Sequence, residues 1–140
     1  MRPIRYYYRM EIEPEMQKSE CRVQNEEKTV LCLVRDLLFY SKIRAAAVTA
    51  GVELQSIRDP GKLLDQPGAG LIVDLNQSEA LQAAAGWKQR TLRPVVGFAS
   101  HVDGQTIQQA RVLGIDRVLA RSQFEQNLPA IFQSLLPKHP

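Results

Sequence analysis

Short apolar runs recur along the chain, and each is followed by a stretch with helical periodicity. Residues 71–74 read Leu-Ile-Val-Asp and come directly after a turn-forming Pro-Gly-Ala-Gly segment. Such a run is typical of a strand that is buried on both faces of a parallel sheet. The same pattern predicts buried strands over 29–34 and 94–99, and a short last strand is predicted over 117–120. Residues 52–57 alternate with period two instead, which predicts a strand nearer the sheet edge.

A helix is predicted after every strand. Following the first strand, apolar residues recur at helical spacing from Phe39 to Ala50, and Gly51 stands where a C-cap glycine belongs. Capping residues predict where most of the later helices begin. These later helices are a short one that opens at Asp59–Pro60 and runs to 64, an alanine-rich one over 78–87, one from the cap Asp103 to Gly114, and one from the cap Ser122 to Leu135.

Five strands and five helices in strict alternation predict an α/β fold. Right-handed crossovers then give a parallel sheet with helices on both faces. A five-stranded sheet of this size suits the flavodoxin-like order 2-1-3-4-5. No Gly-x-Gly-x-x-Gly segment follows the first strand and no Walker-type phosphate loop occurs, so neither nucleotide-binding motif is supported.

The length of 140 residues predicts one domain, which we place at 29–136. Residues 1–28 have little apolar periodicity and balanced charge, so we expect a flexible N-terminal extension, the alternative being a peptide that docks on a partner. Residues 137–140 form a short tail. The net charge of +3 is mild and predicts no direct nucleic-acid binding. Without an apolar run of membrane-spanning length or a secretory signal, we expect a cytoplasmic protein that does not bind membranes.

Polar side chains stand where the buried strands end. The carboxyl ends of strands 1, 3, 4 and 5 meet at one edge of such a sheet, and they carry Arg35, Asp36, Asp74, Ser100 and Arg121. Two carboxylates, a hydroxyl and a cation are what a phosphoryl site needs, since one carboxylate acts as nucleophile and another helps to hold Mg²⁺. The simpler alternative is that Asp74 only caps the next turn or helix.

In these features the chain resembles the receiver domain of bacterial response regulators over about residues 29–136. The resemblance implies that Asp74 is the phosphoacceptor, Ser100 the switch hydroxyl and Arg121 the phosphate-binding cation. It also implies a Mg²⁺ site formed by Asp36, Asp74 and the backbone carbonyl of Asn76. A narrower resemblance is to stand-alone receiver-like proteins with Asp-Leu-x-Phe after strand 1 and Ser-His-Val after strand 4.

Several positions depart from the receiver pattern. Arg35 stands at the first acidic position, so the metal site loses a carboxylate and gains a cation, and we expect this to weaken Mg²⁺ binding. We expect the Arg35 guanidinium to pair with Asp74. Arg121 replaces the usual lysine, and these two cations are not interchangeable. Ser122 replaces the usual proline, and His101 follows the switch hydroxyl.

Two functions follow from the resemblance. The first is a single-domain receiver in a phosphorelay, in which a histidine kinase or other signalling protein is the partner and Asp74 accepts the phosphoryl group. The alternative is a degenerate pseudo-receiver, a protein-binding module that works without phosphorylation. Neither is an enzyme in its own right. A small-molecule enzyme with His101 as general base is a third possibility that the fold alone does not decide. The position of the Arg35 side chain discriminates between the first two. A side chain that lies against Asp36 and Asp74 favours the pseudo-receiver, whereas one that points to solvent leaves a weak metal site possible.

Overall fold

A computed structural model describes residues 28–100 and 102–137. The predicted extension over 1–28, except Lys28, lies outside the described residues, as do His101 and residues 138–140. The strands are β1 (Thr29–Leu33), β2 (Glu53–Ser56), β3 (Gly70–Asp74), β4 (Val95–Ala99) and β5 (Arg117–Ala120). The helices are α2 (Leu37–Ala50), η2 (Pro60–Lys62), α3 (Ala80–Thr91), α4 (Gly104–Val112), α5 (Arg121–Gln126) and α6 (Leu128–Leu135).

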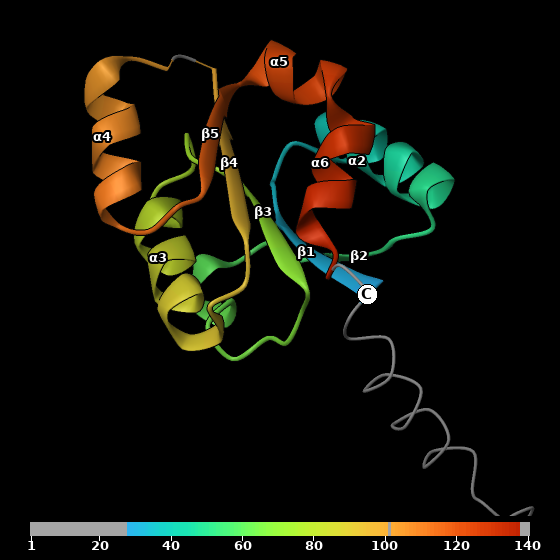
Figure 1. Cartoon of the computed structure of the whole chain (residues 1–140), viewed down its shortest axis with the longest axis horizontal. Helices are drawn as coiled ribbons and strands as arrows, with labels where there is room; N and C mark the ends of the chain where they lie inside the picture. The colour runs from blue at the N-terminus through green and yellow to red at the C-terminus, as the bar shows by residue number, and fades with distance from the viewer. Residues whose placement is uncertain (1–27, 101, 138–140) are drawn as a thin grey trace, which may run out of the picture.

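The five strands form one parallel sheet in the order β2-β1-β3-β4-β5, as predicted (Figure 1). The inner strands β1, β3 and β4 are the continuous apolar runs, because both of their faces are covered. The period-two strand β2 lies at the edge, also as predicted. Helices α2, α5 and α6 cover one face of the sheet, and η2, α3 and α4 cover the other.

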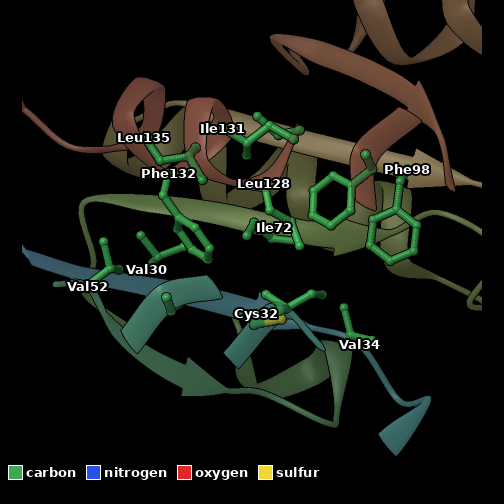
Figure 2. Packing of buried hydrophobic residues seen from close by; sticks show 14 of the residues in the cluster. Val30, Cys32, Val34, Val52, Ile72, Phe98, Leu128, Ile131, Phe132 and Leu135 are labelled. Atoms are coloured by element: carbon green, nitrogen blue, oxygen red, sulfur yellow. The ribbon is translucent and has the colours of Figure 1, made fainter. Parts of the chain in front are cut away.

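Successive residues of a strand point to opposite faces, so β1 supplies both halves of the core. Val30 and Cys32 pack against α2 and α6, where Figure 2 shows them beneath Leu128 and Phe132. Leu31 and Leu33 pack on the other face with Trp87 of α3. Burial raises the pKa of the Cys32 thiol far above its usual range, so Cys32 is a core residue, in keeping with its place in an apolar run.

The capping predictions are confirmed at three of the four predicted sites. Gly51 closes α2 with a positive φ of 74°, and the carboxylates of Asp59 and Asp103 accept backbone N–H groups of η2 and α4. Ser122 is not a cap, because α5 begins at Arg121 and its N-cap residue is Ala120.

The predicted helix over 122–135 is wrong as a single element. The structure has two helices, α5 and α6, separated at Asn127. Pro129 explains the break: it has no N–H to donate to the carbonyl of Glu125, and its ring would clash with that carbonyl in a continuous helix. The predicted helix after β2 is a single 3₁₀ turn. None of the helices in the described part of the chain could cross a membrane.

Candidate functional site at the carboxyl edge of the sheet

The structure brings the predicted site residues to the carboxyl edge of the sheet. Asp36 follows β1, Asp74 is the last residue of β3, Ser100 follows β4, and Arg121 follows β5. An open cleft of about 440 Å³ lies at this edge between the starts of α2 and α5. Asp36, Ser100 and Arg121 line the cleft, whereas Asp74 lies outside its lining.

Asp36 has both carboxylate oxygens engaged. Oδ1 caps α2 by accepting the N–H groups of Leu38 at 3.0 Å and Phe39 at 3.2 Å. Oδ2 accepts a hydrogen bond from Nη2 of Arg121 at 2.6 Å. The bond from Arg121 is the main cause that holds the pKa of Asp36 below its usual range, and the N–H of Phe39 adds to it. Asp36 is therefore an ionised carboxylate with little capacity left for another ligand.

Arg121 is held from a second side by an aromatic ring. Its guanidinium carbon lies 4.1 Å from the centroid of the Phe39 ring, within the range of a cation–π contact. Phe39 is 3% exposed and belongs to a cluster with Phe98 and Phe124. The ion pair and the aromatic contact together fix the guanidinium at the junction of β5 and α5.

Asp74 has a different environment. It is half-buried, and its Oδ1 accepts the N–H of Asn76 at 3.0 Å. The turn-capping role is thus present, although no helix starts there. Burial raises the pKa of the Asp74 carboxyl, and the Asn76 N–H and the positive charge of Arg121 oppose that rise only in part. Within the described residues no cation lies at ion-pair distance from Asp74.

Ser100 is linked to the loop after β3. The side-chain amide of Asn76 donates to Oγ of Ser100 at 3.1 Å. The resemblance gave only the backbone carbonyl of Asn76 a role, so this side-chain link is a new finding. It ties the ends of neighbouring strands β3 and β4 together beside Asp74.

The expected pairing of Arg35 with Asp74 is wrong. Arg35 is exposed and forms no ion pair with the described residues, and it is not among the charges that shift the pKa of Asp74. The residue lies beyond the end of β1, before the cap of α2, where its side chain has solvent available. The cation that enters the site is Arg121, and the acid it binds is Asp36.

The residues present do not fit a Mg²⁺ ion in this arrangement. Mg²⁺ prefers carboxylate oxygens in octahedral geometry. Of the predicted ligands, Asp36 has both oxygens engaged and Asp74 uses one oxygen on Asn76. No group of three or more acidic, histidine or cysteine side chains gathers anywhere in the described part of the chain. In this arrangement the cation that occupies a predicted metal ligand is Arg121, not Arg35.

No protein-family model and no curated protein matches the chain. Solved structures do match it. The phosphorylated cyanobacterial phytochrome response regulator aligns over 79% of this chain and 99% of its own, with a TM-score of 0.67 and 18% identity. An orphan response regulator of H. pylori aligns over 80% and 98%, with a TM-score of 0.69 and 15% identity.

The chain has the fold of a response-regulator receiver domain. A further structure with this receiver fold, a Burkholderia pseudomallei response regulator, contains a phosphorylated aspartic acid and a calcium ion. It aligns over 77% of this chain and 66% of its own, with a TM-score of 0.66 and 16% identity. The predicted flavodoxin-like architecture is thus confirmed.

Proposed function

We propose that this protein is a pseudo-receiver, a receiver-fold module of two-component signalling that binds a signalling protein without phosphorylation of Asp74. The engagement of both Asp36 oxygens carries the proposal. A receiver needs acidic oxygens beside the phosphoacceptor to hold a divalent cation, which neutralises the incoming phosphoryl group. Here the one acid available after β1 is bound to a guanidinium, and the residue before it is Arg35.

The surroundings of Asp74 support the same function. The half-buried Asp74 has no ion-pair partner among the described residues, and the positive charge of Arg121 offsets its desolvation only in part, because that guanidinium is bonded to Asp36. A protein that signals by docking needs only a stable surface. The inner strands and the aromatic cluster beneath Arg121 supply that rigidity.

A second candidate is the phosphoaccepting receiver, with a histidine kinase as phosphodonor and Asp74 as acceptor. One observation favours it: Asp74 stands at the end of the central strand β3, with the hydroxyl of Ser100 linked to the following loop through Asn76. The group transferred would then form an acyl phosphate on a carboxylate oxygen of Asp74, and Arg121 would contact it through N–H groups that it does not use on Asp36.

Intact-mass measurement after incubation with acetyl phosphate and Mg²⁺ separates the two functions. We expect wild type and Asp74→Asn to have unchanged masses, while a phosphoaccepting response regulator treated alongside gains a phosphoryl group. A phosphoryl adduct on wild type that is absent from Asp74→Asn would replace the pseudo-receiver with the second candidate. Proteins that co-purify with the chain should be the same for wild type and Asp74→Asn.

A further inference from the structure

The cleft between α2 and α5 indicates which chemical group of a partner binds there. This inference rests on the proposed docking function. We call it the α2–α5 cleft, and its lining combines two ion pairs with hydroxyl and apolar groups. One ion pair is Arg121–Asp36, and the other joins Lys42 of α2 to Glu125 of α5 at 3.0 Å.

Hydrogen-bond donors are in excess in this cleft. A guanidinium carries five N–H groups, and Arg121 uses one of them on the described residues. Its ring contact and its ion pair hold the remaining donors in place, so little side-chain entropy is lost when they bind a ligand. The exposed Ser122 adds a hydroxyl that has no partner in the described part of the chain. Each of the two carboxylates in the lining, Asp36 and Glu125, is already bound to a cation of the cleft.

Exposed apolar side chains lie at the start of α2, where Leu38 lines the cleft and Leu37 precedes it in the helix. Leu37 and Leu38 occupy the first turn of α2 and are 63% and 81% exposed, and Leu38 is the most exposed of the large hydrophobic residues described. The first turn of a helix commonly carries acidic residues that complement the helix dipole, and α2 has none there. Adjacent exposed leucines beside a hollow surface mark a binding site better than single exposed residues elsewhere.

We propose that the α2–α5 cleft receives a carboxylate side chain of a partner protein, flanked in the partner by apolar residues. The carboxylate accepts hydrogen bonds from the unused N–H groups of Arg121 and from the Ser122 hydroxyl, and the neighbouring apolar residues cover Leu37 and Leu38. Arg121 then bridges two carboxylates, its own Asp36 and that of the partner. Planar guanidinium groups suit this geometry because their donors point in several directions.

The test is a titration of the ¹⁵N-labelled chain with two blocked tripeptides, acetyl-Leu-Glu-Leu-amide and acetyl-Leu-Gln-Leu-amide, without metal or phosphodonor. Amide and arginine Nε–H signals report binding at Leu38 and Arg121. We expect the Glu peptide to shift both signals and to bind at least ~5-fold more tightly than the Gln peptide, a factor equal to about 1 kcal/mol. Equal affinities, or shifts confined to other surfaces, would overturn the proposal.

Variants of the chain test which side chains produce the preference for the Glu peptide. Arg121→Gln should remove the preference for Glu, whereas Arg117→Gln, an exposed arginine at the other end of β5, should keep it. Leu38→Ser leaves the ion pair untouched and should weaken both peptides, so the proposal stays testable if Arg121→Gln perturbs the fold. A preference for Glu that survives in Arg121→Gln would place the carboxylate elsewhere and refute the site. Phosphorylation of Asp74 in the mass assay would refute the pseudo-receiver function and leave this result unaffected.

Discussion

Phe124 is the side chain on which the position of α5 depends. It is the one buried residue of this six-residue helix and is fully inaccessible. Its ring stacks on Phe98 with centroids 4.7 Å apart and lies 6.0 Å from that of Phe39, the ring on which Arg121 rests. Phe124→Ala would open a cavity directly beneath the candidate site.

The expected loss of stability follows from these contacts. Burying one aromatic side chain contributes about 1.5–3 kcal/mol. The two ring contacts add about 0.5–1.5 kcal/mol each. The sum agrees with the ~3–5 kcal/mol typical of Phe→Ala in a core. Because a domain of this size has a free energy of unfolding of about 5–15 kcal/mol, the variant should fold but be markedly less stable.

Urea unfolding followed by circular dichroism measures this free energy. Phe124→Leu fills part of the ring volume and should lose about half as much stability as Phe124→Ala. Gln126→Ala, at an exposed position of the same helix, should stay within about 0.5 kcal/mol of wild type. A loss below about 1 kcal/mol for Phe124→Ala would mean that α5 is held mainly by its ion pairs, and the reasoning above would be refuted.

Three further outcomes are expected. Gly70→Ala should lower the free energy of unfolding, measured in urea, by about 1–3 kcal/mol. The added Cβ would lie 2.9 Å from Cδ2 and 3.1 Å from the carbonyl oxygen of Leu135. Gly104→Ala is the control and should be neutral, because its Cβ would meet open space. Asp36 has a lowered pKa, so its ionised form stabilises the fold above the ordinary carboxyl pKa, and this stabilisation is lost on acidification. Asp74 has a raised pKa, so its ionisation costs stability as the pH rises through the pKa of Asp74. Asp36→Asn should thus be destabilised at neutral pH and Asp74→Asn stabilised, with both differences fading on acidification below the ordinary carboxyl pKa; the opposite sign for either would contradict its described environment. Adding Mg²⁺ should leave the melting temperature unchanged, and a rise would reveal a metal site.

The sheet was predictable because burial on both faces leaves a continuous apolar run. Residues 71–73 and 95–98 are such runs, and the structure places them on neighbouring inner strands. The break at Asn127 was also predictable, because the sequence shows Pro129 two residues later. The apolar residues over 124–135 nevertheless predict one continuous helix, because their spacing continues across the break and they pack on the same face of the sheet.

The pairing inside the candidate site could not be read from the sequence. Both arginines follow strands, and the residue nearer in sequence to Asp36 is Arg35. The partner is nevertheless Arg121, which follows β5, and β5 is not a neighbour of β1 in the sheet. The contact forms because α2 and α5 pack over the same face, which brings their first residues together. Such a contact depends on the tertiary arrangement of helices, which the pattern of single strands does not specify.

The position of β1 inside the sheet has a consequence for synthesis of the chain. Leu31 and Leu33 are covered by Leu71, Val73 and Trp87, residues made 38 to 56 positions later. At about 5–20 residues per second, a ribosome needs several seconds to supply them. During that interval Leu31 and Leu33 lack most of the side chains that cover them, so this half of the core forms only after α3 has been synthesised.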